Sequence, residues 1–398
     1  MRKWIRNFGP GTLIVAAFIG PGTITTCIRA GANFGFSLLW ALLFSIVATI
    51  FLQEMAARVG LVTKKGLTNA ITDQLSSRIA KTLIITLVFT AIVIGNTAYE
   101  AGNISGSVLG MEALFGPEAI RLYPIIIGLI GFGLLITGSY KVIEKSLMVL
   151  VVLMSISFIL AAVITQPDLS EISKGMFIPT TPENSLPIII GILGTTVVPY
   201  NLFLHSSLVR EKWKSVDKLR LVRIDLIVSI ILGGIVSIAI VISAAAMTGG
   251  NVSSVMDLAK GLEPVYGDMA RYFLGIGLFA AGITSAITAP LAAAFVARNC
   301  FKWDASLKDI KFRAVWMGIL ILGVVFSSIN LKPIEVILFA QIINGLLLPI
   351  VAIFLLWIVN NKKVLGKYTN KLVTNILSVI IILLTIFLGF KAIQNAIG

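Results

Sequence analysis

The chain has 398 residues, of which 57% are hydrophobic and 13% charged, and its mean hydropathy is +0.99. Soluble domains contain roughly 45–50% apolar residues, so this composition excludes an ordinary soluble enzyme. Lys and Arg number 32 against 18 Asp and Glu. The basic residues lie between apolar runs of spanning length, which indicates membrane topology and not nucleic-acid binding. Two cysteines and one histidine are too few for a disulfide framework or a Cys/His zinc cluster, and no cofactor is expected.

Apolar windows of about 19 residues predict eleven membrane-spanning helices. They lie at residues 10–28, 37–56, 83–110, 122–139, 146–165, 186–208, 226–247, 272–296, 314–330, 336–358 and 372–392. The sequence starts with Met-Arg-Lys-Trp and enters the first window without a small-residue cleavage site, so the start is interpreted as mature protein. No connecting loop is long enough for an extramembrane domain. Residues 1–398 are therefore expected to form one all-α transmembrane domain.

Basic residues gather in alternate loops, those that follow the even-numbered windows. Under the positive-inside rule these loops are cytoplasmic, which predicts a cytoplasmic N-terminus and an extracellular C-terminus, in a bacterial plasma membrane. Residues 62–82 and 209–225 are polar enough to be cytoplasmic connectors near the membrane surface. The lipid bilayer is thus the expected partner of these charges, and nucleic acid is not.

Two of the predicted helices carry glycine and proline near their middle. The first contains the run Gly20–Thr23 (Gly-Pro-Gly-Thr), and the sixth contains Gly194 followed by Pro199. Proline removes a backbone donor and disfavours helical geometry in the preceding residue, while glycine permits an unwound path. We therefore predict breaks around Gly20–Thr23 and Thr195–Pro199. A proline kink that serves only packing is the alternative for either helix.

The two prolines lie five predicted helices apart, as a five-plus-five inverted repeat would place them. The repeats would cover about residues 9–165 and 186–358, with residues 372–392 as an extra helix. Interrupted helices at matching positions of two halves are the best sequence pointer to the substrate site of a secondary transporter. The two breaks are accordingly the predicted transport site.

The residues around the second break also carry a family resemblance. The matching stretches include the run Gly191–Ser206, the segment Gly9–Gly11, and Gln341 with Pro349 in the tenth window. On these residues the chain resembles the natural resistance-associated macrophage protein (NRAMP) family over effectively its whole length. The resemblance implies the leucine-transporter-type fold, with broken helices 1 and 6, and proton-coupled import of divalent metals.

The chain departs from that family at its metal-binding residues. The family has Asp-Pro-Gly-Asn in helix 1, where this chain has Gly20–Thr23, so the acid and the amide are both replaced. The family has Ala-x-x-Met-Pro-His in helix 6, where Val198 replaces the methionine whose sulfur selects soft metals and Tyr200 replaces the histidine. In helix 3 the resemblance implies acidic residues for proton transfer, and the chain has Glu100 but then Asn103. The coupling ion, H⁺ or Na⁺, stays open.

These replacements favour a secondary transporter for a small anion, with bicarbonate as an example. Without a carboxylate or a thioether, the half-helix N-termini would present free N–H groups and a positive dipole end. No metal ligands are predicted. The predicted substrate-binding residues are Gly20, Pro21, Gly22, Thr23, Thr195, Thr196, Val198, Tyr200, Asn201, Gln341 and Asn344.

Other readings stay open. The leading alternative keeps the cation class of the family: a divalent metal transporter in which Mg²⁺ is held partly through its waters, or Mn²⁺ is bound, with or without proton coupling. A sensor or scaffold that has lost transport is a third reading. No nucleophile and base arrangement is visible, so enzymatic catalysis is not expected. The sequence indicates no oligomeric state.

Four residues are predicted to form the coupling or proton pathway: Glu100, Asn103, His205 and Glu54. Glu100 is an acid well inside a predicted span, where burial of a charge costs free energy and therefore points to function. His205 is the only side chain whose unperturbed pKa lies near physiological pH. The structural alternatives are a Glu100 carboxyl bonded to a neighbouring Asn, a structural imidazole at His205, and helix-to-helix hydrogen bonds from Gln341 and Asn344.

Glycines recur every four residues in the third window, at Gly102, Gly106 and Gly110. This spacing places small residues on one face of a helix, and it predicts that another helix packs closely there.

Overall fold

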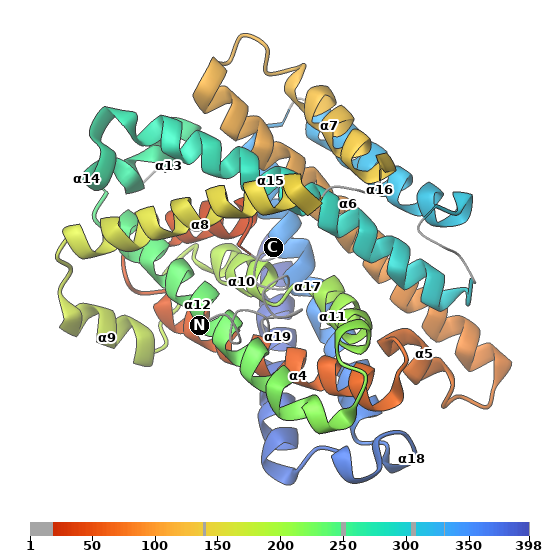
Figure 1. Ribbon diagram of the computed structural model, residues 1–398. Helices are drawn as coiled ribbons and strands as arrows, with labels where there is room; N and C mark the ends of the chain where they lie inside the picture. The colour runs from red at the N-terminus through yellow and green to blue at the C-terminus, as the bar shows by residue number, and fades with distance from the viewer. Residues whose placement is uncertain (1–18, 138–140, 248–251, 304–307, 330, 398) are drawn as a thin grey trace.

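The structure is a computed structural model that describes residues 19–137, 141–247, 252–303, 308–329 and 331–397. The described residues form helices and connecting turns, with no strand among them (Figure 1). The longer helices are α3 (Pro21–Phe34), α4 (Leu39–Thr63), α6 (Arg78–Phe115), α7 (Tyr123–Thr137), α8 (Lys141–Ile164), α10 (Leu186–Thr196), α11 (Pro199–Lys212), α12 (Leu219–Ala245), α15 (Ala270–Cys300), α16 (Ile310–Ser328), α17 (Pro333–Val359) and α19 (Leu372–Ile397). The shorter ones are α5 (Leu67–Thr72), α9 (Leu169–Phe177), α13 (Val255–Ala259), α14 (Glu263–Tyr266) and α18 (Lys362–Leu365).

Within the described ranges, eight helices are long and apolar enough to cross a membrane. The count becomes nine if the pair Met148–Ile164 and Leu169–Phe177, bent by 118°, is one span. Helix α7 has 15 residues and α3 has 14, short of the roughly 20 that a straight span needs. The predicted first window begins at residue 10, and its first half lies outside the described residues. The all-α membrane fold is confirmed, whereas the count of eleven is not.

The helices begin and end for local reasons that the sequence contains. Ser77 caps α6 by accepting a hydrogen bond from the Ala80 N–H at 3.4 Å, and Asp168 caps α9 by accepting from Ser170 N–H at 2.7 Å. Such caps satisfy N–H groups that the first turn leaves without a partner. Helix α6 extends beyond the predicted window 83–110 because it begins earlier, through Arg78 and Lys81, and continues past Glu112 at its other end. Hydropathy therefore underestimates its length.

Helix α6, orange in Figure 1, packs against α15, α16 and α17. Its glycine face makes two close approaches. A Cβ atom at Gly106 would clash with the ring of Pro21, and one at Gly110 would lie 2.6 Å from the Gly275 carbonyl oxygen. The close packing predicted from the glycine spacing is confirmed. It holds the first turn of α3 directly against α6.

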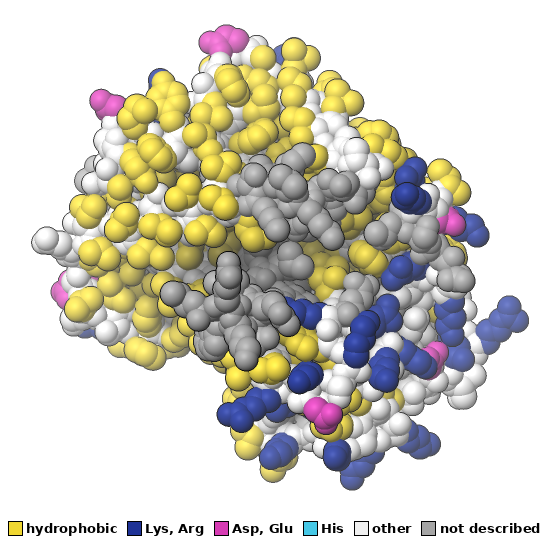
Figure 2. All heavy atoms as spheres, viewed as in Figure 1, with side chains coloured by type: hydrophobic (Ala, Val, Ile, Leu, Met, Phe, Trp, Pro, Cys, Tyr) yellow, Lys and Arg dark blue, Asp and Glu magenta, His cyan; other side chains and the backbone are white. Residues whose placement is uncertain are grey.

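Charge is concentrated at one end of the molecule. Figure 2 shows Lys and Arg side chains gathered at the end where α5 and α18 lie in Figure 1, while the rest of the visible face is mainly hydrophobic. Large apolar side chains such as Ile79, Leu129 and Phe390 are more than half exposed. In a soluble protein such a surface would aggregate, so it is the surface of a protein that lies in lipid.

Candidate functional site

The first predicted break is visible at the start of α3. Gly20 has extended backbone, with φ −114° and ψ −174°, and Pro21 is the first helical residue. Proline suits this position because its missing N–H would have no partner in the first turn. Gly22 and Thr23 are already helical, so the break is narrower than the predicted span Gly20–Thr23. The part of the first window before Ile19 lies outside the described residues.

The second break separates α10 from α11. Helix α10 ends at Thr196, Val197 and Val198 are non-helical, and Pro199 starts α11. Thr195 remains helical, as does Thr196, whose hydroxyl donates to the Ile192 carbonyl at 2.8 Å. The prediction of an unwound stretch over Thr195–Pro199 was therefore too wide, because a proline at the first position of α11 lets the helix restart at once.

The two breaks lie next to each other. The hydroxyl oxygens of Thr23 and Thr195 are 2.8 Å apart, and both side chains are fully buried. The Thr196 hydroxyl is hydrogen-bonded within α10, and the backbone carbonyl of Thr196 accepts a hydrogen bond from the Thr49 hydroxyl at 3.4 Å. Of the predicted threonines, two thus meet at the centre, and the third supports the end of α10.

Helix α17 brings two amide side chains to the same region. Gln341 and Asn344 are each 1% exposed. A Cβ atom at Gly22 would clash with the Gln341 amide nitrogen, and one at Gly194 would clash with the Gln341 carbonyl oxygen. The absence of side chains at Gly22 and Gly194 therefore lets α17 approach both breaks. This places Gln341 beside α3 and α10 together.

The structure adds two residues that the sequence interpretation missed. A Cβ atom at Gly20 would lie 3.0 Å from the Ser285 Oγ and 3.8 Å from the Tyr99 hydroxyl oxygen. The ring of Tyr99 packs edge-on against that of Tyr200, with centroids 5.5 Å apart. The only sequence signal for Ser285 is a hydroxyl residue inside an apolar helix. For Tyr99 it is the position next to Glu100.

Several buried polar atoms around the breaks have no hydrogen-bond partner. Among them are Thr25 Oγ1, Thr26 Oγ1, Asn201 Oδ1, Ser285 Oγ, Gln341 Oε1 and Asn344 Nδ2. Buried polar groups are normally paired, since leaving one unpaired costs about 1–3 kcal/mol. Five of these six atoms are oxygens, and the two amide oxygens can only accept. The other three oxygens are hydroxyls, which can donate as well as accept, so these side chains offer oxygen ligands that a cation could use.

Glu100 also lies on α6, the helix that carries Tyr99. It is fully buried, accepts a hydrogen bond from Asn103 Nδ2 at 3.4 Å, and its second oxygen has no partner. A Cβ atom at Gly323 would clash with the Glu100 side chain, so the carboxyl packs against α16. The structure does not bring Glu100 into contact with Thr23 or Thr195. Asn103 serves as its partner, as the structural alternative expects.

His205 and Glu54 have their own partners. His205 lies on α11, fully buried, with Nδ1 2.9 Å from Gln53 Oε1 and Nε2 unpaired. Glu54 accepts from Arg58 at 3.0 Å and forms an ion pair with Arg223 at 2.8 Å. Arg58, which is 4% exposed, also donates to the Tyr368 carbonyl at 2.6 Å and to Asn370 Oδ1. Glu54 thus joins helices α4 and α12, and it is not placed at the breaks.

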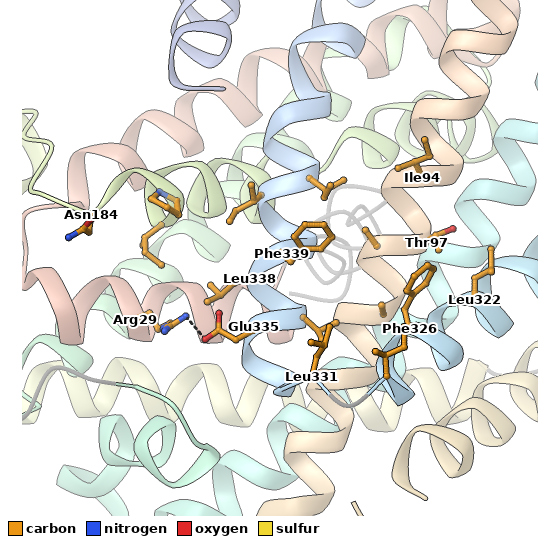
Figure 3. A pocket seen from close by; sticks show the side chains of 18 of the residues that line it. Arg29, Ile94, Thr97, Asn184, Leu322, Phe326, Leu331, Glu335, Leu338 and Phe339 are labelled. Atoms are coloured by element: carbon orange, nitrogen blue, oxygen red, sulfur yellow. Dashed lines mark ion pairs between the residues drawn. The ribbon is translucent and has the colours of Figure 1, made fainter. Parts of the chain in front are cut away.

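A cavity of about 1210 Å³ lies between α3, α6, α10, α16 and α17 (Figure 3). Its lining is mainly apolar, and its main polar feature is the Arg29–Glu335 ion pair of 3.3 Å. None of the predicted site residues lines it. Phe339, at its centre in Figure 3, is 60% exposed. This cavity suits hydrocarbon and is not the ion site.

No group of three or more His, Cys, Asp or Glu residues in the described part of the chain could hold a metal ion. Any cation at the breaks would therefore be bound by hydroxyl, amide and carbonyl oxygens. Such hard ligands suit hard cations such as Mg²⁺ and Mn²⁺ better than soft ones.

Solved structures share this fold. A manganese transporter of Eremococcus coleocola, in complex with an aromatic bis-isothiourea substituted compound, matches with a TM-score of 0.80 at 21% identity, covering 98% of this chain and 86% of that one. MhsT in complex with L-phenylalanine matches with a TM-score of 0.61 at 14% identity, over 96% and 98% of the two chains. At these identities the likeness concerns the fold, which is that of the leucine-transporter type with two broken helices.

Curated relatives correct the predicted substrate. The divalent metal cation transporter MntH of Listeria welshimeri is 30% identical over 99% of this chain and 91% of its own length. That of Caldanaerobacter subterraneus is 26% identical over 96% and 91%. The prediction of a small anion such as bicarbonate is wrong, because these relatives are named for divalent cations.

The family itself follows from a match over nearly the whole chain. The model of the family described as "Natural resistance-associated macrophage protein-like" matches residues 11–394, which include both breaks and α19. The chain is an integral membrane protein and belongs to the natural resistance-associated macrophage protein-like family of transporters.

Proposed function

We propose that the protein is a secondary transporter of a hard divalent metal cation, Mg²⁺ or Mn²⁺, bound at the two breaks. The observation that carries the proposal is the cluster of buried oxygens without hydrogen-bond partners around Thr23 and Thr195. The curated relatives named divalent metal cation transporters support the charge class. The substrate-binding residues remain those predicted from the sequence, with Tyr99 and Ser285 added.

The C-terminal end of α10 favours a cation at this point. Helix α10 ends at Thr196, so its last carbonyl groups lack helical donors and carry the negative end of the helix dipole. In transporters with discontinuous helices, such carbonyls and C-terminal ends coordinate cations. Neutral ligands leave much of the ion's charge uncompensated, so the cation would keep part of its hydration, as Mg²⁺ commonly does.

Coupling is proposed to involve H⁺, with Glu100 as the titrating group. A buried carboxyl with one unpaired oxygen is unusual within a span and points to ion or proton movement. Asn103 would orient this carboxyl, while His205 and Glu54 would act through the helices that they join. Coupling to Na⁺ is the alternative. Measuring metal uptake under an H⁺ gradient and, separately, under a Na⁺ gradient distinguishes the two coupling ions.

The experiment is uptake into liposomes that contain the purified protein. We expect Mn²⁺ and Mg²⁺ to enter faster than into empty liposomes, Cd²⁺ to enter more slowly than either, and an inward pH gradient to increase the rate. Labelled bicarbonate serves as the anion control. Protein-dependent bicarbonate entry with no metal entry would contradict the proposal, as would a preference for Cd²⁺.

The orientation of the chain belongs to the same proposal. The end rich in Lys and Arg (Figure 2) would face the cytoplasm of a bacterial cell, with the N-terminus on that side and the C-terminus outside. The repeat boundaries, residues 9–165 and 186–358 followed by an extra helix at 372–392, remain predictions. A tag accessible from outside only at the C-terminus would support the orientation, and one accessible only at the N-terminus would contradict it.

A further inference from the structure

A second site lies at the basic end of the molecule, apart from the breaks. A pocket of about 460 Å³ is formed by the turn after α4, by α5, by the end of α11 and by the end of α15. Its lining residues are Lys65, Asn69, Asp73, Arg210, Arg298, Asn299, Lys302 and Trp303. Four of these carry positive charge and one carries negative charge, so the pocket has a strong excess of positive charge.

The single acid organises two of the cations. Asp73 Oδ2 lies 2.6 Å from Lys65 Nζ, and Asp73 Oδ1 lies 3.3 Å from Lys302 Nζ. Partial burial raises the pKa of Asp73, but the hydrogen bonds from Lys65 and Lys302 outweigh it and leave the pKa below its ordinary value. The carboxylate is therefore ionised at neutral pH. It holds two lysines from distant parts of the chain toward each other across the pocket.

The two arginines bring further positive charge from α11 and α15. Arg210 Nη1 donates to the carbonyl of Lys64 at 3.4 Å, an uncharged acceptor. The Arg298 guanidinium lies over the ring of Phe295, 4.9 Å from its centroid. Guanidinium groups bind phosphate oxygens through paired N–H donors, and ammonium groups add charge. Four cations collected in one pocket also repel one another, and a bound anion would relieve this repulsion.

An aromatic wall closes one side of the pocket. The ring of Trp303 stacks on that of Phe301 with centroids 5.2 Å apart, and Phe301 packs edge-on against Phe89 of α6. The wall is therefore fixed to the helix core and is not a free side chain. It lines the pocket together with Lys65 and Lys302, whose side chains are more than half exposed.

We propose that this pocket binds a phosphate-bearing anion and thereby links α5, α11 and α15. Helix α11 starts at the second break and carries Asn201 and His205. A ligand that joins the end of α11 to its neighbours would restrain movement of this half-helix, and so regulate transport from outside the ion site. Free phosphates and the headgroups of anionic lipids share this chemistry.

The test measures binding of pyrophosphate to the full chain in nanodiscs of neutral phosphatidylcholine, by the shift of the thermal unfolding midpoint. We expect a rise that weakens with salt. Lys302→Gln should weaken binding by about tenfold, and Asp73→Asn should strengthen it several-fold, because they remove charges of opposite sign. Both variants break the same ion pair, so a purely structural role would shift both in the same direction.

Lys174→Gln is the matched control, since Lys174 is an exposed lysine paired with Glu171 away from the pocket. It should leave pyrophosphate binding unchanged. Adding phosphatidylglycerol to the nanodisc shows which kind of phosphate the pocket binds. If this lipid raises the unfolding midpoint and pyrophosphate then causes no further rise, the ligand is a lipid headgroup. If pyrophosphate still raises the midpoint, the ligand is a soluble phosphate. Absence of both responses would overturn the proposal. A shift of Lys302→Gln and Asp73→Asn in the same direction would also overturn it, as would an equal effect of Lys174→Gln.

Discussion

The hydroxyls of Thr23 and Thr195, 2.8 Å apart, join the first turn of α3 to the last turn of α10. We expect Thr23→Val to leave the Thr195 hydroxyl without this partner, which costs about 1–3 kcal/mol of stability, and to reduce Mn²⁺ uptake. Thr23→Ser keeps the oxygen and should retain most uptake. The measurement is liposome uptake with the unfolding midpoint recorded in parallel. Equal uptake by the Val and Ser variants would exclude a role of this oxygen.

Restoring a carboxylate at the first break should strengthen metal binding. A Cβ at Gly20 would lie 3.0 Å from Ser285 Oγ, so the serine side chain has to move slightly to admit the new residue. A charge pair about 4 Å apart attracts by about 4 kcal/mol per unit charge at an effective dielectric of 20. Gly20→Asp should therefore bind Mn²⁺ about tenfold more tightly or better, whereas Gly20→Asn should not. Calorimetric titration decides, and equal affinities would show that charge is not the limiting factor.

Selectivity should follow the side chain at the second break. Val198 is fully buried in the non-helical segment between α10 and α11. Val198→Met adds a thioether that favours soft metals, so we expect uptake of Cd²⁺ relative to Mg²⁺ to rise by about tenfold, or about 1.4 kcal/mol. Val198→Leu adds bulk without sulfur and should not change the ratio. A similar change in both variants would mean that pocket size sets selectivity.

Proton coupling should depend on Glu100. Glu100→Gln keeps a hydrogen-bonding side chain beside Asn103 but cannot titrate. We expect metal uptake to continue while its increase under an inward pH gradient disappears. Glu112→Gln, on the same helix near its end, is the control and should behave as the unmodified protein. If the pH response survives in Glu100→Gln, another group carries the proton.

The close approach of α6 to α3 should appear in stability. A methyl group at Gly106 has no room beside Pro21, and overpacking of this kind costs about 1–3 kcal/mol. At Gly318 on α16 nothing lies within 4 Å of the added Cβ. Gly106→Ala should therefore lower the unfolding midpoint, while Gly318→Ala should leave it unchanged or raise it. Equal shifts would contradict the packing assigned to Gly106.

The breaks could be predicted from the sequence because they depend on local chemistry. Proline and glycine act on their own backbone, so Pro21 and Pro199 locate the start of α3 and of α11 without knowledge of the fold. The family resemblance supplied the fold class in the same way. The widths of the breaks were not predictable, since they depend on how soon each helix recovers its hydrogen bonds.

The substrate class could not be read correctly from the residues that were lost. Because positions 20 and 198 lack a carboxylate and a thioether, the sequence indicated that the site binds an anion in place of a metal cation. The oxygens that remain unpaired come from α11, α15 and α17 as well, at Asn201, Ser285 and Gln341. Whether such an oxygen is left unpaired depends on how the helices pack, and no local pattern in the sequence reports it.

The three hydrogen bonds of Arg58 have a consequence for the end of the chain. Two of its acceptors, the Tyr368 carbonyl and Asn370, lie just before α19, and the guanidinium is almost entirely buried. A chain cut short before Tyr368 would strand this charge inside α4 with only Glu54 beside it. Leaving buried donors without their acceptors costs about 1–3 kcal/mol, and more where the donor is charged. The segment before α19 thus stabilises α4 near the start of the chain. A premature stop before Tyr368 would therefore lower the stability of the first half as well as remove α19.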